Sequence, residues 1–457
     1  MARQRSQYVC QQCGGVHPKW SGQCDHCGGW NSLVEESEEK APGPAGRSKG
    51  KAVELESLKS SGQTLPRIKT GIAEFDRVLG GGLVPGSATL IGGDPGIGKS
   101  TLLLQMACKM ATSGAGTAYF SGEESADQIR LRAKRLNLDG TPPDGVGIAT
   151  LTDAANIAAS LQASPGVSLA IIDSIQTMYL PSIESGPGTV SQVRASAHEL
   201  IRCAKKQGIA IIIVGHVTKD GAIAGPKVLE HMVDTVLQFE GDRSHHFRIL
   251  RGIKNRFGPT DEIGVFEMSA AGLNEVANPS ELFLADRRED VSGAVVFAGI
   301  EGTRPVLVEI QALVAPSSMA HPRRNVVGWD AGRLSMLAAV LEARAGIPLS
   351  GRDIFLNVAG GVKISEPAAD LAVAAALISS VTGRPCPRNT VIFGEVGLAA
   401  EARRVSHPEQ RLKEAAKLGF EQVIMPPLKA KGLDLSGMSV HAVDSLNALI
   451  ESLGGRV

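Results

Sequence analysis

The chain has 457 residues, in which 47 Lys and Arg balance 47 Asp and Glu, so its formal net charge is zero. A chain of this length is expected to form two or three domains, because single cores seldom grow beyond roughly 250–300 residues. The hydrophobic share of 43% and the charged share of 21% are typical of a folded protein and exclude wholesale disorder. The zero net charge excludes a uniformly basic nucleic-acid binder, although it leaves room for local basic patches.

The sequence also indicates a cytoplasmic protein with no membrane partner. Its longest apolar run, residues 371–378, has eight residues, far fewer than the ~18 that a membrane span needs. The first residues, Met-Ala-Arg-Gln-Arg, lack the apolar segment of a secretory signal.

Four of the seven cysteines lie within the first 27 residues, as two Cys-x-x-Cys pairs separated by ten residues. Each pair can place two thiolates on one tight turn, and two such turns complete a tetrahedral Zn²⁺ shell. Disulfides or a redox motif are the alternatives, but cytoplasmic chains rarely keep structural disulfides, and such redox motifs need a βαβ context. We therefore predict a zinc-binding module over residues 1–34, with the ligands Cys10, Cys13, Cys24 and Cys27.

Composition then changes twice along the chain. Residues 35–62, an acidic run followed by Ala, Pro, Gly, Lys and Ser, cannot bury a core and are predicted to form a flexible linker. Residues 63–278 alternate between strand-like and helix-like apolar segments, which predicts an α/β domain. The expected strands are 88–92, 117–121, 169–173, 209–214, 233–240 and 247–254, and the expected helices are 99–112, 125–136 and 190–207.

The remaining residues, 279–457, are predicted to form a separate C-terminal α+β domain. Its expected strands are 294–300, 306–314, 391–396 and 422–425, and its expected helices are 331–345 and 367–381.

The strongest motif, Gly-Asp-Pro-Gly-Ile-Gly-Lys-Ser at residues 93–100, matches G-x-x-x-x-G-K-[ST] between an apolar strand and a helix. In such a P-loop, backbone N–H groups surround the phosphates, Lys99 reaches the β- and γ-oxygens, and the Ser100 hydroxyl ligates Mg²⁺. A glycine-rich turn without nucleotide is the alternative. We predict binding of ATP with Mg²⁺, through Gly93, Asp94, Pro95, Gly96, Ile97, Gly98, Lys99, Ser100 and Thr101.

Two further strand ends carry carboxylates. Asp173 ends an apolar strand, which is the Walker B arrangement that holds the Mg²⁺ shell. Glu123 and Glu124 follow another strand, where a carboxylate can orient or deprotonate the attacking water. We favour Glu123 as this base, although both glutamates could instead charge the first turn of the helix that starts near residue 125.

Two glycine-rich loops, 181–189 and 216–227, follow central strands and are expected at the sheet edge where open α/β folds bind ligands. Downstream, Arg243, Arg248, Arg251, Lys254 and Arg256 alternate with aromatic residues and end in Lys-Asn-Arg-Phe-Gly. This cluster could bind a phosphate backbone, or Lys254 and Arg256 could enter the ATP site of a neighbouring subunit. A solvated face of an edge hairpin is the third possibility.

The P-loop, the preceding segment 71–82, the four-cysteine N-terminus and the motif at 254–258 together resemble the bacterial RadA (Sms) family over nearly the whole chain. The resemblance implies a RecA-like ATPase core, a C-terminal domain similar to that of Lon protease, and a role in homologous recombination and DNA repair. It implies a ring-shaped, homo-hexameric DNA-dependent ATPase that moves on single-stranded DNA, processes branched intermediates and has a RecA-type recombinase as partner. In this comparison Glu123 matches the catalytic glutamate, and the two loops match DNA-contacting loops.

The C-terminal domain departs from active Lon domains, which carry a nucleophilic Ser directly after a Pro. Ala368 follows Pro367 here, and Lys413, which could correspond to the Lon lysine, has nothing to activate. We therefore do not expect peptidase activity. An ATP-dependent peptidase and a KaiC-like signalling ATPase are the alternative functions, and the second leaves the zinc module and residues 254–258 without a role.

Overall fold

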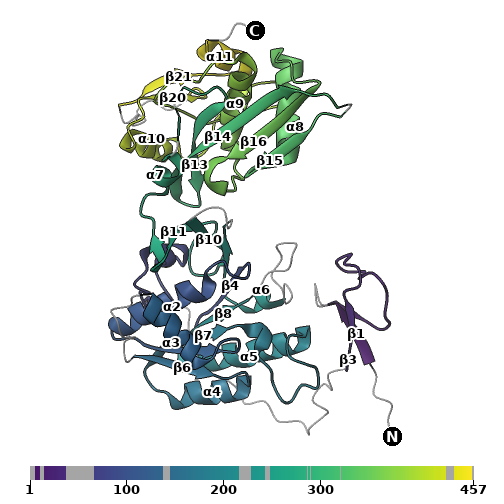
Figure 1. The fold of residues 1–457 in the computed structure, drawn as a ribbon, viewed down its shortest axis with the longest axis vertical. Coiled ribbons are helices and arrows are strands. Elements are labelled where there is room, and N and C mark those ends of the chain that lie inside the picture. Colours follow the sequence, from purple (N-terminus) through teal and green to yellow (C-terminus); the bar gives the residue numbers. More distant parts are fainter. Residues whose placement is uncertain are drawn as a thin grey trace, which may run out of the picture. The chain divides into compact units, whose positions relative to one another are not determined.

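The structure is a computed structural model that describes residues 6–10, 15–37, 66–136, 145–215, 228–241, 247–285, 287–288, 290–319, 321–428 and 437–454. The chain forms two compact units, Met1–Glu275 and Val276–Val457 (Figure 1). The predicted ligand Cys13, Arg243, the predicted loop 216–227 and most of the predicted linker lie outside the described residues. No helix in the described part of the chain is long and apolar enough to cross a membrane.

The first described residues form a small antiparallel sheet. Its strands are β1 (Ser6–Cys10), β2 (Val16–His17) and β3 (Leu33–Ser37), and β1 lies between the other two. Cys10, Cys24 and Leu33 are buried together, with Tyr8 packed against them. So small a core supplies little folding free energy, and small domains of this kind usually depend on a structural metal or disulfides.

The sheet of the α/β core has nine strands, in the order β12-β11-β10-β9-β4-β8-β7-β5-β6. The bounds are β4 Ala88–Gly93, β5 Gly116–Ser121, β6 Val146–Thr150, β7 Val167–Asp173, β8 Ala210–Val214, β9 Thr235–Glu240, β10 Phe247–Asn255, β11 Ile263–Ser269 and β12 Gly272–Glu275. The strands from β9 to β6 in this order are parallel, whereas β10, β11 and β12 continue the sheet in antiparallel pairing.

Helices cover both faces of this sheet (Figure 1). Their bounds are α1 Ala73–Val78, α2 Lys99–Thr112, α3 Ala126–Arg135, α4 Ala154–Ala163, α5 Val190–Gln207 and α6 Val228–Met232, with a short 3₁₀ helix η1 at Ile175–Thr177. The helices α1, α2 and α3 share one apolar cluster, and α4, α5 and α6 share another. In β7, Leu169 and Ile171 enter the first cluster, whereas Ala170 and Ile172 enter the second. Because successive strand residues face opposite sides, a strand covered on both faces must be apolar throughout.

The second unit contains a seven-stranded sheet in the order β15-β16-β14-β13-β17-β20-β21 and a separate pair, β18 with β19. The strand bounds are β13 Ala294–Glu301, β14 Arg304–Pro316, β15 Arg324–Val327, β16 Arg352–Val358, β17 Thr390–Ile392, β18 Glu395–Val396, β19 Ala402–Arg403, β20 Gln422–Met425 and β21 Ser439–Ala442. The helix bounds are α7 Pro279–Leu284, α8 Ala331–Ala345, α9 Asp370–Thr382, α10 Pro408–Lys417 and α11 Leu446–Ser452, with 3₁₀ helices η2 Ala359–Gly361 and η3 Pro367–Ala369. Residues 370–379 of α9 are all buried, as expected for a helix that is apolar on every side.

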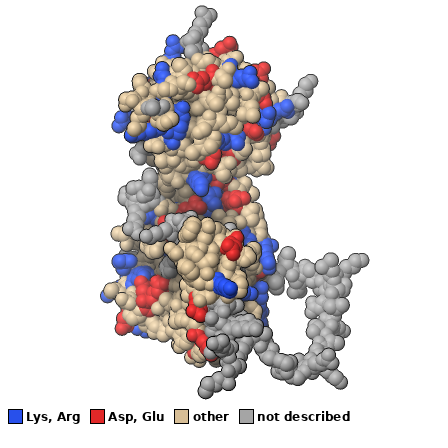
Figure 2. Space-filling model, turned by 90° about the vertical axis from the view of Figure 1, so that its right-hand side faces the viewer, with Lys and Arg blue, Asp and Glu red and all other residues tan. Residues whose placement is uncertain are grey.

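The predicted α/β core and α+β C-terminal domain are confirmed, and the helices at 99–112, 190–207 and 331–345 have the predicted bounds. The single strand predicted at 391–396 is wrong, because the structure divides it into β17 and β18. The reason is Gly394, whose N–H donates to Ala368 O and whose carbonyl accepts from Leu371 N, so it bonds to the start of α9 instead of a strand. On the face shown in Figure 2, basic and acidic side chains are interspersed, which fits the zero net charge.

Candidate active site

The P-loop connects β4 to α2 and is packed closely on its inner side. A Cβ atom at Gly93 would lie 2.6 Å from the Phe239 carbonyl oxygen, and one at Gly98, whose φ is 117°, would lie 2.9 Å from Cε of Met268. At Gly96, with a φ of 78°, a Cβ atom would have nothing within 4 Å. The loop is therefore held against the core at Gly93 and Gly98, while its backbone stays accessible at Gly96, as close approach of a phosphate requires.

Lys99 begins α2 and is buried, with 4% of its surface exposed. Its Nζ donates to the carbonyl oxygens of Gly93, at 2.6 Å, and Asp94, at 3.0 Å. Burial lowers the pKa of Lys99, whereas the carboxylates of Asp173, Asp94 and Glu123 act to raise it. The ammonium group thus lies near the acidic residues that the sequence singled out. Ser100 and Thr101 follow in the first turn of α2 and are half-buried.

Asp173 ends β7, which is separated from β4 by β8, so the Asp173 side chain and the P-loop lie at the same edge of the sheet. Its Oδ2 accepts a hydrogen bond of 2.5 Å from the Tyr119 hydroxyl, and both side chains are buried. Burial and the Asp173 charge raise the pKa of Tyr119 well above its ordinary value, so the phenol remains a donor. Sequence reasoning missed Tyr119, because a tyrosine inside an apolar strand is indistinguishable from an ordinary core residue.

Glu123 and Glu124 follow β5 but have different partners. The Ser174 hydroxyl donates to Oε1 of Glu123 at 2.5 Å, and Ser174 directly follows Asp173. Glu124 instead forms an ion pair with Arg132 of α3. The helix starts only after Ser125, which caps it together with Gln128, so neither glutamate lies inside its first turn. Glu123 is the one of the two whose carboxylate contacts the segment beside Asp173.

The loop 181–189 leaves η1 at the same edge of the sheet and is held by one buried side chain of α5. Gln192 Nε2 donates to the carbonyl oxygens of Leu180, Ile183 and Ser185, at 3.2, 3.0 and 2.8 Å. Its Oε1 accepts from the Leu180 N–H at 2.8 Å. Both groups of the amide are used, so Gln192 fixes the first half of the loop. No pattern in the sequence signals this role.

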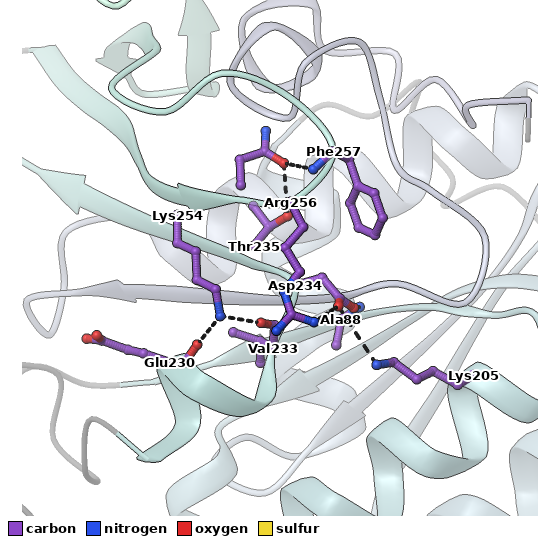
Figure 3. A network of polar contacts seen from close by, with 10 residues as sticks. Ala88, Lys205, Glu230, Val233, Asp234, Thr235, Lys254, Arg256 and Phe257 are labelled. Atoms are coloured by element: carbon purple, nitrogen blue, oxygen red, sulfur yellow. Dashed lines mark hydrogen bonds and ion pairs between the residues drawn. The ribbon is translucent and has the colours of Figure 1, made fainter. Parts of the chain in front are cut away.

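The predicted basic cluster at 254–256 forms a network of its own (Figure 3). Lys254 Nζ donates to the carbonyl oxygens of Glu230 and Val233, at 2.6 and 2.8 Å, where α6 ends. Arg256 lies 3.3 Å from the buried carboxylate of Asp234, which also accepts from the Ala88 N–H at 3.0 Å. Burial lowers the pKa of Lys254, and the charge of Arg256 lowers it further.

This network lies at the opposite edge of the sheet from the P-loop. Lys254 pairs with Val236 near the beginning of β9, beside the beginning of β4, whereas the P-loop follows the end of β4. A strand rises about 3.3 Å per residue, so the four steps from Thr89 to Gly93 separate the two edges by roughly 13 Å before the loop is counted. Within one chain, the structure does not bring Lys254 and Arg256 together with Lys99, Glu123 and Asp173.

Three of the four predicted zinc ligands lie together. The Sγ atoms of Cys10, Cys24 and Cys27 lie within 4.8 Å of one another, and those of Cys10 and Cys27 are 3.7 Å apart. The Ser32 hydroxyl lies 3.2 Å from the Cys10 sulfur, and His17 Nε2 lies 3.4 Å from the Cys24 sulfur. Three thiols gathered in this way, with polar side chains around them, fit the tetrahedral thiolate shell of Zn²⁺.

In the second unit, Ala368 lies in η3 and is buried, with 2% of its surface exposed. Two residues before it, Glu366 forms a bidentate ion pair with the buried Arg411 of α10, through hydrogen bonds of 3.1 and 2.6 Å. Arg411 also donates to the carbonyl oxygen of Ala298 at 2.6 Å. Lys413 is exposed on the same helix. Ala368 has no hydroxyl or thiol that could act as a nucleophile at this position.

Comparisons with known proteins match three segments of the chain to family models. Residues 8–35 match the rubredoxin metal binding domain, residues 56–222 match an AAA domain, and residues 334–429 match subunit ChlI of Mg-chelatase. Fold and site together define a P-loop ATPase with a RecA-like core, an N-terminal zinc ribbon and a ChlI- or Lon-like C-terminal region.

Full-length relatives identify the family. The chain is 58% identical to "DNA repair protein RadA" of Brucella abortus, over 93% of this chain and 92% of that one. It is 49% identical to the protein of the same name from Bacillus subtilis, over the full length of both chains. It is 50% identical to that from Pseudomonas aeruginosa, over 99% of this chain and all of the other. The chain belongs to the RadA family of DNA repair ATPases, so the predicted resemblance and the predicted fold class are confirmed.

Proposed function

We propose that the chain hydrolyses ATP to move on single-stranded DNA and to process branched intermediates of homologous recombination, as a homo-hexameric ring that cooperates with a RecA-type recombinase. The single observation that carries this proposal is the convergence of Lys99, Asp173 and Glu123 at one edge of the sheet, beside a P-loop whose backbone is accessible. The relatives named for DNA repair support the choice of DNA as the ligand that stimulates the ATPase.

The proposed chemistry assigns one task to each residue. Backbone N–H groups of Gly96 to Ser100 would bind the phosphates at the start of α2, and Lys99 would stabilise charge on the transferred phosphoryl group. Bound Mg²⁺ would neutralise the β- and γ-phosphates, held by the Ser100 hydroxyl and by Asp173. Glu123 would orient the attacking water and accept its proton. The Tyr119 hydroxyl would keep Asp173 in place through its hydrogen bond.

For DNA, we propose the loop 181–189 as one contact, because it leaves the same sheet edge as the nucleotide site. For Lys254 and Arg256 we propose a task across a subunit interface. Their place at the opposite edge of the sheet supports this, since they can approach a nucleotide only if a second copy supplies it. Head-to-tail contacts that close a ring provide such an arrangement.

For the N-terminal module we propose one Zn²⁺ ion, bound by Cys10, Cys13, Cys24 and Cys27. The gathering of three of these sulfur atoms and the smallness of the surrounding core support the proposal. The ion would supply folding energy to the module, which would present its surface to DNA or to a protein partner.

The peptidase alternative is disfavoured by Ala368, which cannot act as a nucleophile. A casein-cleavage assay with ATP is expected to show no activity. The signalling alternative predicts ATP turnover that does not respond to DNA.

Phosphate release measured with and without an oligothymidine tests the main proposal. We expect single-stranded DNA to raise turnover, and we expect Lys99→Ala to abolish turnover with a melting temperature close to that of the wild type. Removing a positioned charge from phosphoryl transfer typically costs factors of 10² or more. Turnover in Lys99→Ala above about a tenth of the wild-type value would contradict the role proposed for Lys99. A wild-type rate that is the same with and without DNA would contradict the proposed DNA dependence.

A further inference from the structure

Ser174 contacts the proposed catalytic base. It directly follows Asp173, its side chain is fully buried, and its Oγ donates to Oε1 of Glu123 at 2.5 Å. A hydrogen bond from a hydroxyl to a carboxylate is charge-assisted and stronger than one between neutral groups. One oxygen of Glu123 is therefore held by Ser174. This bond fixes the orientation of the carboxylate, and with it the direction in which its other lone pairs point.

Ser174 is also the first residue of the segment that leads to the loop 181–189. Its carbonyl oxygen accepts hydrogen bonds from the Thr177 N–H, at 3.3 Å, and from the Thr177 hydroxyl, at 2.8 Å. These bonds close the 3₁₀ turn η1. A shift of Thr177 would therefore displace Ser174.

Thr177 in turn packs against the residue that precedes Glu123. A Cβ atom at Gly122 would lie 1.9 Å from Oγ1 of Thr177 and 2.7 Å from its Cβ, so only glycine permits this approach. The Gly122 N–H also donates to the Asp173 carbonyl oxygen at 2.9 Å. Residues 122–123 and 174–177 therefore form one closely packed unit between the end of β5 and the end of β7.

The chain between this unit and the loop is held in place by packing and by hydrogen bonds. Ile175 and Met178 are fully buried in the apolar cluster of α4 and α5, and the Tyr179 N–H donates to the Thr152 carbonyl oxygen at 2.9 Å. Leu180 is bonded at both its N–H and its carbonyl by Gln192. A close-packed segment transmits a displacement instead of absorbing it.

We propose that Ser174 is a positioning residue that couples the loop 181–189 to Glu123, so that a ligand on the loop changes the orientation of the carboxylate through the Ser174 hydroxyl. This inference rests on the proposed function, in which Glu123 is the base and the loop contacts single-stranded DNA. It adds the path by which DNA would stimulate hydrolysis.

The test compares turnover of the full chain with and without an oligothymidine in wild type and Ser174→Ala. We expect the ratio of kcat with DNA to kcat without DNA to fall by about tenfold, because a hydrogen bond to a charged group is lost. If the wild-type ratio is itself below about ten, it should fall to near one. The KM for ATP and the affinity for a fluorescent oligothymidine should stay within about twofold of wild type, since neither ligand contacts Ser174 in the proposed arrangement. A wild-type ratio in Ser174→Ala would overturn the inference.

Matched variants separate this role from simple packing. Thr177→Val removes the hydroxyl that bonds to Ser174 but keeps the shape of the side chain, whereas Thr177→Ser keeps the hydroxyl. We expect a reduced ratio only in Thr177→Val, and equal ratios in both would overturn the inference even if Ser174→Ala fails to fold. Thr117→Val removes a buried hydroxyl at the start of the same strand, β5, and should leave the ratio unchanged. If Glu123→Gln hydrolyses ATP normally, the proposed role of Glu123 as the base fails. If Glu123→Gln is inactive and Ser174→Ala keeps the wild-type ratio, only this inference fails.

Discussion

At the scale of single residues, two adjacent glutamates with different partners should respond differently to substitution. Glu123→Gln is expected to bind ATP normally and to hydrolyse it 10²–10⁴-fold more slowly, which is the usual contribution of a general base. Glu124→Gln weakens the partly exposed pair with Arg132, which costs roughly 1 kcal/mol or less of folding free energy. Turnover of Glu124→Gln should therefore stay within about threefold of wild type. Nucleotide binding and single-turnover hydrolysis measure both effects, and the reverse pattern would make Glu124 the base.

The cysteines should divide into two chemical groups. Burial raises the pKa of Cys108 and of Cys386 to about 11, so at pH 8 only about one thiol in a thousand is ionised at each. Alkylation of the folded, zinc-loaded chain at pH 8 should leave both unlabelled. Their labelling should begin only as the pH rises toward 11, where the reactive thiolate forms.

The thiols of the N-terminal cluster should behave differently in the same experiment. A metal-bound thiolate is protected from alkylation until the metal is removed. Mass spectrometry should therefore find Cys10, Cys24 and Cys27 labelled after treatment with a chelator and protected before it. Labelling of these three in the untreated chain that carries one equivalent of zinc would contradict their assignment as ligands.

At the scale of elements, the sequence predicted those that are long or strongly patterned. The helices at 99–112 and 190–207 and the strand at 169–173 were predicted nearly to the residue, because their apolar periodicity matches one geometry only. In the α/β core, the strands β6, β11 and β12 and the helices α1, α4 and α6 were missed. In β6, Val-Gly-Ile-Ala-Thr is half-exposed at the edge of the sheet and carries too few apolar residues to stand out from a loop.

The candidate site divides in the same way. The P-loop, Asp173 and Glu123 are local signals, since each lies at or just after the end of a strand. The bonds from Tyr119 to Asp173, from Ser174 to Glu123 and from Gln192 to its loop depend on how distant segments pack. No spacing in the sequence encodes such contacts, so only the fold could reveal them.

Gln192 supplies a prediction at this scale, because it joins a helix to a loop. Gln192→Glu keeps the size of the side chain but removes the three hydrogen bonds that Nε2 donates and places a carboxylate beside three carbonyl oxygens. The loop 181–189 should become mobile, with faster amide exchange and easier proteolysis, since its anchor is lost. Stimulation by single-stranded DNA should fall, while basal turnover stays within about twofold.

The exposed Gln207, at the end of the same helix, provides the control. Gln207→Glu introduces the same charge without a buried partner and should change neither exchange nor stimulation. Unchanged amide exchange across the loop in Gln192→Glu would show that the loop is held by other contacts.

At the scale of the whole molecule, the two edges of one sheet carry groups that hydrolysis by a ring ATPase would need together. Lys99, Asp173 and Glu123 lie at one edge. Lys254 and Arg256, which are drawn in Figure 3, lie at the other. A cation supplied by a neighbouring subunit is worth roughly 10³–10⁵ in rate in related phosphoryl transfers. Two copies arranged head to tail would bring the two edges together, and each interface would then contain a complete set.

We therefore expect Lys254→Ala to resemble Lys99→Ala in turnover while it still binds DNA. The two inactive variants should complement each other when mixed, because an interface that joins the P-loop of Lys254→Ala to the Lys254 edge of Lys99→Ala is complete. Random mixing at equal amounts would leave roughly a quarter of the interfaces intact in a head-to-tail ring. Phosphate release from mixed rings, compared with each variant alone, measures this recovery.

Since Lys254 also bonds to the carbonyls of Glu230 and Val233, a melting curve of Lys254→Ala must accompany the assay. If mixing restores nothing, and Lys254→Ala loses DNA affinity together with about one unit of its salt dependence, Lys254 binds the phosphate backbone instead.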